Sequence, residues 1–256
     1  MAENCLLFLT YINEPRERFE YIVYNKRQIT LNILGGIMNN KKMTRNKTYN
    51  VLPGTRMGLL TIEYLEKLTG IARKHNIPFF KITSAQRLAI VGHTPETAKK
   101  IWQELGQQEG PKKPVGIHYI QACPGARWCK YGRQDSLAMG EKLEKTLGAL
   151  PLPAKTKVGI SGCPLNCCES YVRDIGIFGK KKGWSLVFGG NGGGCPRIGD
   201  IVAEDLNDNE VIALAGKCLD FYRNNARPME RTGRFMKRTN IDTFWEYIGV
   251  RGKNRY

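Results

Sequence analysis

The chain reads CPGARWC at residues 123–129 and CPLNC at residues 163–167. The two cysteine pairs have different gaps and are separated by a helix-length stretch, so the fold must carry them to one point in space. Four soft thiolates brought together in this way suit an iron–sulfur cluster. The pattern therefore predicts electron-transfer chemistry.

Other uses of four cysteines fit this chain less well. Structural zinc sites place paired cysteines about two to four residues apart on tight knuckles, and the gap between Cys123 and Cys129 is longer. Disulfide frameworks belong to short secreted domains, whereas this chain has 256 residues and begins without a signal-peptide pattern. Buried cysteines without a ligand are the plainest alternative. We therefore expect reduced thiols and a cytoplasmic protein.

Length and charge narrow the class of protein. A chain of 256 residues can bury a core as one large domain or two small ones. Its apolar runs, such as Cys5 to Thr10, are far shorter than a membrane span, so we expect a soluble protein without a membrane partner. The formal charge of +17 calls for an anionic partner. No nucleic-acid-binding motif accompanies the basic runs, so nucleic acid is not the expected partner.

Residues 1–47 are predicted to be an N-terminal extension without site chemistry. The codons for Gly35, Gly36 and Ile37 can contain a purine-rich ribosome-binding sequence just upstream of Met38. We hypothesise that translation begins at Met38 or Met43, with a genuine N-terminal strand and helix as the alternative.

Residues 48–112 are predicted to form a βαββα unit, which is a ferredoxin-like half-domain in outline. The patterning predicts, in order, strand 48–52, helix 61–74, strands 77–83 and 87–91, and a helix that starts at Thr94. Residues 110–114, with two prolines and two lysines, are expected to be a hinge.

Residues 113–256 are predicted to form an α/β domain. Expected strands cover residues 116–122, 157–161, 175–178 and 185–188, and expected helices follow Asp135 and cover about residues 208–223 and 242–248. Cys123 and Cys163 each stand just past an expected strand, where loops place chemistry on a rigid support. The expected fold class is α+β, a half-domain followed by an α/β cluster-binding domain.

Residues 123–132 and 160–167 resemble the signature of siroheme-dependent nitrite and sulfite reductases. Further stretches match at residues 81–87, 128–136, 174–176, 183–184, 190–193 and 196–197. The likeness covers about residues 49–248 and is closest to the siroheme region of assimilatory nitrite reductase and to the small single-chain sulfite reductases. It implies an oxidoreductase that uses a [4Fe-4S] cluster and siroheme for the six-electron reduction of sulfite to sulfide or of nitrite to ammonia.

By this resemblance Cys123, Cys129, Cys163 and Cys167 hold the cluster, and the Cys167 sulfur also binds the siroheme iron. The shared thiolate would couple the two centres, so that electrons arriving singly reach a substrate that needs six. Two further cysteines remain. Cys168 competes for the bridge, but its side chain should point elsewhere from the same turn. Cys195 departs from the family pattern and is either an unliganded thiol or a redox-sensitive one.

The carboxylates of siroheme would need fixed cations and backbone N–H donors. The candidates are Arg56, Arg87, Arg127 and Arg197, with Asn191 and its neighbouring glycines allowing close approach of the backbone. A solvated surface role is the alternative for each arginine. Arg87 and Arg197 are the firmest candidates because their flanking residues also match.

A small oxyanion on the open face of the ring must be held and protonated. Lys155 and Lys157 match the family's paired-lysine pattern, in which alternate residues of a strand point the same way. We assign both to anion binding and proton supply, with Arg87 as a third cation. His118 or Tyr119 stands where the larger enzymes place another arginine.

Larger sulfite reductases resemble two copies of this unit, with the lysine pair on one copy and the working cluster on the other. We therefore hypothesise a homodimer in which each chain lends its lysines to the other chain's siroheme. Electrons must come from outside, because no dinucleotide fingerprint follows a strand. An acidic donor such as ferredoxin or a reductase subunit suits the basic surface.

A function of another class is also considered, that of a non-catalytic iron–sulfur or tetrapyrrole carrier or assembly protein. The lysine pair and Arg87 favour the enzyme, because a carrier has no use for a cationic pocket. Sulfite and nitrite are both small anions served by similar cations, so both are retained as substrates.

Overall fold

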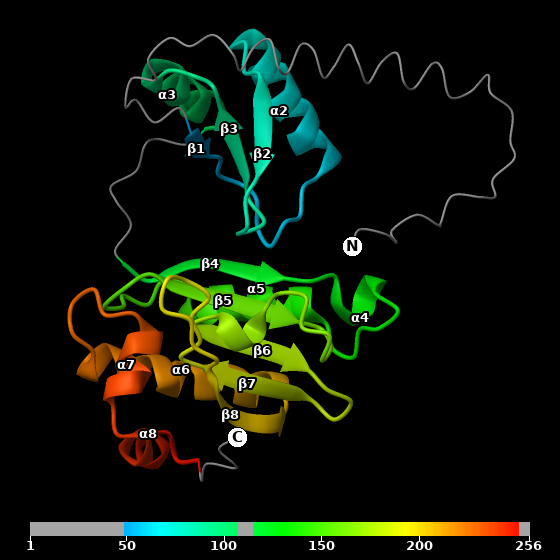
Figure 1. Ribbon diagram of the computed structural model, residues 1–256. Coiled ribbons are helices and arrows are strands. Elements are labelled where there is room, and N and C mark those ends of the chain that lie inside the picture. Colours follow the sequence, from blue (N-terminus) through cyan, green and yellow to red (C-terminus); the bar gives the residue numbers. More distant parts are fainter. Residues whose placement is uncertain (1–48, 107–114, 251–256) are drawn as a thin grey trace, which may run out of the picture. The chain divides into compact units, whose positions relative to one another are not determined.

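The computed structural model describes residues 49–106 and 115–250 (Figure 1). The expected N-terminal extension, with Cys5, Met38 and Met43, and the expected hinge at 110–114 lie outside these residues. Two sheets organise the described chain, one of three strands and one of five.

The first sheet belongs to the predicted half-domain, whose βαββα order is confirmed. Its elements are β1 (Tyr49–Val51), α2 (Ile62–Lys74), β2 (Phe79–Ile82), β3 (Leu88–Val91) and α3 (Pro95–Glu104). The strands pair antiparallel in the order β1-β3-β2. Both helices start at threonine caps, because the side chains of Thr61 and Thr94 accept hydrogen bonds from Tyr64 N and Thr97 N. Its buried core consists of Leu52, Leu68, Ile71, Leu88, Ile90 and Ile101.

The second sheet carries the cysteine loops. Its strands lie in chain order, β4 (Ile117–Ala122), β5 (Thr156–Ser161), β6 (Ile175–Gly179), β7 (Trp184–Phe188) and β8 (Asp200–Leu206). The first three strands run parallel, and β7 and β8 are antiparallel to their neighbours. The sheet is mixed because helix α5 (Ser136–Leu147) forms the crossover that connects parallel β4 and β5, whereas a short turn joins antiparallel β6 and β7, and the loop 189–199 joins β7 to β8.

The remaining helices complete this domain. They are α4 (Gly125–Trp128), the 3₁₀ turn η1 (Ser170–Val172), α6 (Asp208–Asn225), α7 (Thr232–Arg238) and α8 (Ile241–Ile248). Helices α5, α6 and α8 pack their apolar residues into one core with the inner face of the sheet, including Leu143, Val158, Ile177, Leu219 and Phe244. The fold class predicted from the sequence is thus confirmed.

One irregularity in the sheet bears on the site. The register between β4 and β5 shifts between Ile117 and Tyr119, so His118 is the extra residue of a β-bulge. A bulge leaves its extra residue out of the ladder and re-aims the side chain. Beyond the bulge Tyr119 pairs with Lys157 across the two strands.

Within residues 49–106 and 115–250, no helix combines the length and the apolar character that crossing a bilayer demands.

Candidate functional site

The two cysteine loops leave the sheet at the same edge, because Cys123 follows β4 and Cys163 follows β5, the parallel neighbour of β4. Backbone hydrogen bonds join the loops. Cys123 N donates to Ile160 O over 3.1 Å, and the backbone N–H groups of Arg133 and Gln134 both donate to Gly162 O, over 2.7 and 3.0 Å. Gly162 N donates to the Cys123 sulfur over 3.0 Å. Both loops are therefore fixed relative to each other by backbone groups.

Glycines make this approach possible. A Cβ on Gly162 would lie 2.6 Å from the Cα atom of Gly125, which is closer than real Cβ atoms come to backbone atoms. Gly125 itself has a φ of +65°, a conformation that side chains disfavour, and a Cβ there would meet the Ser136 hydroxyl at 2.5 Å. That hydroxyl donates to Cys123 O over 2.6 Å. The Cys123 loop is thereby held against the start of α5.

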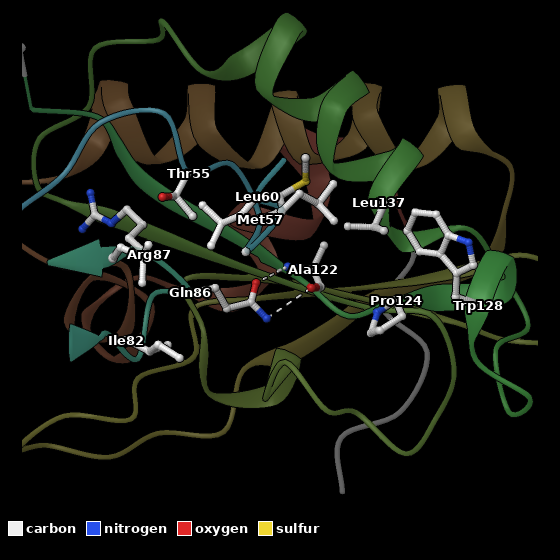
Figure 2. A pocket seen from close by; sticks show the side chains of 13 residues that line it. Thr55, Met57, Leu60, Ile82, Gln86, Arg87, Ala122, Pro124, Trp128 and Leu137 are labelled. Carbon is white, nitrogen blue, oxygen red and sulfur yellow. Dashed lines mark hydrogen bonds between the residues drawn. The ribbon is translucent and has the colours of Figure 1, made fainter. Parts of the chain in front are cut away.

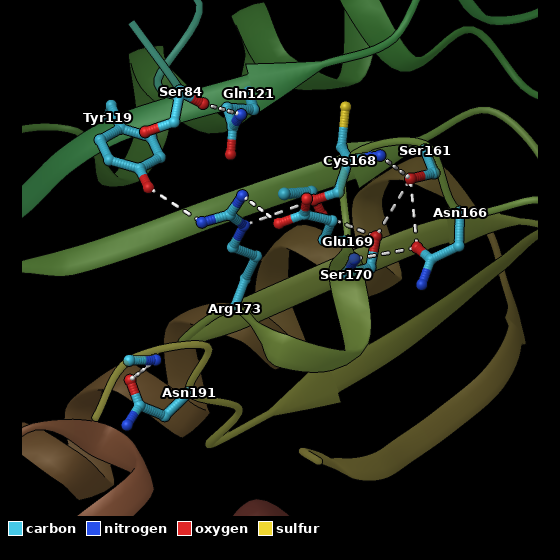
Figure 3. A network of polar contacts seen from close by, with 12 residues as sticks. Ser84, Tyr119, Gln121, Ser161, Asn166, Cys168, Glu169, Ser170, Arg173 and Asn191 are labelled. Atoms are coloured by element: carbon cyan, nitrogen blue, oxygen red, sulfur yellow. Dashed lines mark hydrogen bonds and ion pairs between the residues drawn. The ribbon is translucent and has the colours of Figure 1, made fainter. Parts of the chain in front are cut away.

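A side-chain network shapes the second loop (Figure 3). The Asn166 side-chain oxygen accepts from Ser170 N over 2.9 Å and from the Ser161 hydroxyl over 3.2 Å. The Ser161 hydroxyl in turn accepts from Cys168 N over 3.1 Å. These bonds satisfy a tight turn in which Asn166 itself has a φ of +59°.

The two neighbouring cysteines of this turn differ in their exposure to solvent. Cys167 is exposed, whereas Cys168 is buried. Burial, with the nearby sulfurs of Cys123 and Cys167 acting in the same direction, raises the pKa of the Cys168 thiol to about 12. The Cys168 sulfur therefore lies close to two of the predicted ligands but stays protonated.

All seven cysteines within the described residues are free thiols. In the same part of the chain, no three or more His, Cys, Asp or Glu side chains gather in a way that could hold a single metal ion. A cube of iron and sulfide is wider than one ion, so its four cysteines approach separate corners and need not converge on one point. Hydrogen bonds between the loops bring Cys123 next to Gly162, the neighbour of Cys163, and the joint role of the four cysteines stays a prediction.

A pocket of about 350 Å³ opens beside Cys123 (Figure 2). This volume falls in the range of about 300 to 1,000 Å³ that is typical of cofactor pockets. Arg87 and Trp128 lie at opposite ends, with Gln86 and Ala122 between them. The Gln86 amide donates to Ala122 O over 3.2 Å and accepts from Ala122 N over 3.1 Å. The β2–β3 turn is thus fastened to the end of β4, directly before Cys123.

Two polar atoms of this pocket have no partner. Thr55 Oγ1 and Arg87 Nε are both buried and lack a hydrogen bond within the described residues. Buried polar groups are normally satisfied, and each unsatisfied one costs about 1–3 kcal/mol. A largely apolar pocket with an unsatisfied hydroxyl and an unsatisfied guanidinium N–H fits a flat ring that carries carboxylates.

A second feature, a group of cations around Tyr119, adjoins the pocket at Arg87. The Arg87 guanidinium, the Lys157 ammonium and the Arg173 guanidinium lie 5.9, 5.9 and 6.0 Å from the centroid of the Tyr119 ring. Arg173 also donates to the Tyr119 hydroxyl over 3.0 Å. We call Arg87, Lys155, Lys157, Arg173 and Arg231 the cation cluster. Such a set suits a small oxyanion.

The Asp174 carboxylate binds Arg231 and the backbone of Lys157, two members of the cation cluster. This carboxylate is almost completely buried and accepts from Arg231 Nε over 3.2 Å, from Arg231 Nη2 over 2.5 Å, from Lys157 N over 2.8 Å and from the Thr232 hydroxyl. It therefore ties the start of α7 to β5 and holds Arg231 beside Lys157.

The crowding of positive charge affects Lys157. Burial lowers the pKa of its ammonium group, and the positive charges of Arg231 and Arg173 lower it further, while Asp174 opposes them. An ammonium group with a lowered pKa is a better proton donor. Lys155, in contrast, is exposed just before β5, on the same side of the strand as Lys157, because Thr156 and Val158 between and beyond them are buried.

The other predicted cofactor residues lie apart from this cluster. Arg56 is largely exposed and lies 3.8 Å from the Glu144 carboxylate. Arg127 is also exposed, forms an ion pair of 2.9 Å with Asp135 and lies over the Trp128 ring. Neither side chain is buried.

Arg197 and Asn191 belong to the glycine-rich loop. Arg197 donates to Gly189 O and Ile198 O, each over 3.0 Å, and forms an ion pair of 2.6 Å with Asp200. The Asn191 side chain donates to Cys195 O over 2.6 Å and accepts from Gly193 N over 3.2 Å. In this arrangement both side chains shape the loop, and Cys195 is exposed beside them.

Sequence reasoning missed Arg173, Arg231 and Asp174 as site residues. Arg173 and Asp174 follow η1 directly, in a stretch adjoining the matched residues 174–176, but no local pattern connects them with Arg231. Arg231 lies in a basic run that reads as a solvated face. Only the fold places these residues beside the lysine pair.

The sequence of this chain matches two family models and several known proteins. The family model described as nitrite and sulphite reductase 4Fe-4S domain matches residues 116–255, and the model described as nitrite/sulfite reductase ferredoxin-like half domain matches residues 41–108. An assimilatory-type sulfite reductase of Nitratidesulfovibrio vulgaris is 44% identical over 214 residues, which cover 84% of this chain and 96% of that protein.

Longer proteins match over part of their length. A nitrite reductase [NAD(P)H] of Bacillus subtilis is 35% identical over 77% of this chain, and the match covers 24% of the relative. Among solved structures, dissimilatory sulfite reductase I has a TM-score of 0.67 with 14% sequence identity, over 81% of this chain and 72% of that one. The latter likeness concerns the fold.

Proposed function

Because the chain belongs to the nitrite and sulphite reductase family, we propose that it reduces sulfite or nitrite by six electrons at a siroheme coupled to a [4Fe-4S] cluster. The observation that carries the proposal is the meeting, at Arg87, of the apolar pocket beside Cys123 and the cation cluster around Tyr119. The pocket suits a large ring and the cluster suits a small anion. A non-catalytic carrier would need the first and not the second.

The donor set of this chain fits the proposed pair of cofactors. Cys123, Cys129, Cys163 and Cys167 would hold the [4Fe-4S] cluster, with the exposed Cys167 as the bridge to siroheme. The buried, unsatisfied Thr55 Oγ1 and Arg87 Nε would receive hydrogen-bonding partners from the ring's carboxylates. When bound, the coupled centres supply electrons to the substrate one at a time.

The residues of the chain bind and protonate the anion. Arg87, Lys155 and Lys157 would hold the oxyanion, and Arg173 and Arg231 would add to the positive potential. Lys157 is suited to proton supply because its pKa is lowered.

The proposed homodimer rests on the resemblance to larger sulfite reductases, in which the lysine pair and the working cluster belong to different copies of this unit. In the dimer, the lysine pair of each chain would contribute to the anion site of the other chain. The alternative is that one chain holds the whole site, since its pocket and its cation cluster meet at Arg87. Sedimentation analysis of the holoprotein tests this pairing, and full activity in a monomer would contradict it.

The electron donor is proposed to be an acidic protein, such as ferredoxin or a reductase subunit, because the chain carries a formal charge of +17. Binding should then weaken as salt is raised. The cytoplasm is the proposed location, since thiolates that hold a cluster must stay reduced.

The deciding experiment is an absorption spectrum of the purified holoprotein, followed by turnover with a reduced dye and either anion. Siroheme bands together with dye oxidation by sulfite or nitrite are expected. A cluster spectrum without siroheme or turnover would support the carrier instead. Comparing the two anions with one reductant identifies the preferred substrate.

A further inference from the structure

His118 is a titratable side chain at the cation cluster to which the preceding function assigns no role. It is the extra residue of the bulge in β4, so its ring is turned out of the strand ladder. The ring lies 5.7 Å from that of Tyr119, and its Nε2 atom lies 3.5 Å from Arg87 Nη2. The residue is exposed to solvent at the edge of the cluster. A small anion among the cations would therefore lie within reach of this imidazole.

The groups that face His118 come from every element around it. Arg87 directly precedes β3, Lys155 directly precedes β5, Lys157 lies in β5, Arg231 precedes α7, and Tyr119 is its neighbour on β4. The atoms packed against the ring lower its pKa by partial burial, even though one side stays open to solvent, and the four positive charges lower it further. The imidazole is therefore uncharged near neutral pH while no anion is present.

An anion bound among these cations raises the pKa of His118 again, because a nearby negative charge favours the imidazolium form. We propose that His118 is a catalytic residue of the reduction, which takes a proton from solvent when the anion binds and gives it to a substrate oxygen as that oxygen leaves. This inference rests on the proposed function. It identifies a proton donor of the same site that the lysine pattern does not include.

The chemistry balances for each oxygen removed from sulfite. Two electrons from the external donor and two protons convert one oxygen into water, and the S–O bond breaks. His118 supplies one of these protons, and the ammonium group of Lys155 or Lys157 is the neighbouring source of the other. The open side of the His118 ring then allows its reprotonation from solvent before the next oxygen leaves.

Two substitutions separate proton donation from simple attraction of the anion. His118→Gln keeps a hydrogen-bonding group without a titration, and His118→Arg supplies a permanent charge that does not release its proton. The matched control is His75→Gln in the half-domain, where His75 contacts Glu104 over 2.7 Å. Siroheme and cluster content, read from the absorption spectrum, establishes that each holoprotein is assembled.

The first readout is proton uptake when the oxidised holoenzyme binds nitrite, followed with a pH indicator in weak buffer. Nitrite is chosen because it does not itself titrate near neutral pH, as sulfite does. Wild type and His75→Gln should take up protons on binding, and His118→Gln and His118→Arg should not. The second readout is the pH profile of kcat. In the wild type kcat should fall as the pH rises through the pKa of His118, and in both His118 variants kcat should be about 10²-fold or more lower and lack this fall, keeping only the loss at alkaline pH where the lysines lose their charge.

Several results would overturn the role of His118. Unchanged proton uptake in His118→Gln would do so, as would full activity of His118→Arg, which would reduce the residue to a positive charge. Loss of siroheme from both variants would make His118 a cofactor-binding residue instead. If the wild type itself neither binds nor reduces the anions, the proposed function fails; if the wild type is active and His118→Gln equals it, only the present inference fails.

Discussion

Replacing Asp174 by asparagine tests whether one buried carboxylate holds the cation cluster together. Asp174 is 1% exposed and accepts hydrogen bonds from Arg231, Thr232 and the backbone of Lys157. Asparagine has almost the same shape, but it removes the negative charge and turns one acceptor oxygen into a donor. That donor would face groups that are themselves donors.

The expected loss of unfolding free energy follows from the burial of the Asp174–Arg231 ion pair. Removing one partner of a buried ion pair costs about 3–5 kcal/mol. The Arg231 side chain is 31% exposed and can recover some hydration, so we expect a loss near the lower end, about 3 kcal/mol of unfolding free energy. For a domain of this size about 1 kcal/mol shifts Tm by about 2–4 °C, so Tm should fall by about 6–12 °C.

Thermal unfolding of the holoprotein, followed by circular dichroism at one fixed scan rate, measures this change. The matched control is Asp220→Asn, because Asp220 forms an exposed ion pair of 2.9 Å with Arg223 and should contribute less than about 1 kcal/mol. The KM for sulfite should also rise in Asp174→Asn, since Arg231 is no longer held beside Lys157. A fall in Tm no larger than that of Asp220→Asn would refute the reasoning.

Three further predictions concern the cofactor loops and the lysines. Cys167→Ser should lower kcat at least about 100-fold and change the coupled absorption bands, because mutation of even the outer-shell partners of metal ligands lowers metal affinity or activity about 10- to 100-fold. Cys168→Ser should leave the absorption bands unchanged. If Cys168→Ser changes the bands and Cys167→Ser does not, the roles of the two cysteines are exchanged. Gln86→Leu removes both hydrogen bonds to Ala122 and should lower the free energy of unfolding by about 2 kcal/mol, measured by thermal unfolding; an unchanged Tm would contradict this. Because the folded-state pKa of Lys157 lies below its ordinary value of 10.5, its charge is present at lower pH and is lost earlier on the alkaline side than that of a free lysine. Sulfite affinity should fall as the pH rises through that folded-state pKa, and the fall should be absent in Lys157→Gln.

Sequence patterns within a few residues were sufficient to predict the strands and the helix next to the cysteine loops. Strand alternation predicted β4 and β5 to within one residue, and Asp135 was expected to cap a helix. Its side chain does accept from Ala138 N over 3.1 Å. Caps and alternation are encoded within a few residues, so the sequence contains them directly.

Four elements of the second sheet's domain were not predicted, namely α4, η1, β8 and α7. Strand β8 carries Asp200, Glu204 and Asp205 and lies at the edge of the sheet, so its alternation is weak. Helix α7 lies in a basic stretch for which no helix was predicted, yet Phe235 and Met236 within it are buried. Here tertiary packing, rather than periodicity, determines the structure.

The cation cluster depends on distant parts of the chain. Lys155 and Lys157 were identified from a short pattern, whereas Arg231 approaches them only because Asp174 on the neighbouring segment binds it. The hydrogen bonds between Gln86 and Ala122 likewise join the β2–β3 turn to the end of β4, two segments that no local signal relates. Such pairings become visible once strand order and register are known.

The close contact between Gly125 and Gly162 makes the two cysteine loops one structural unit. Neither loop can be exchanged for one from another scaffold unless its counterpart is transplanted with it, because any side chain at the contact would wedge the loops apart. Engineering of the redox potential is therefore better attempted from the outer edge of each loop, where the geometry that joins them is left intact.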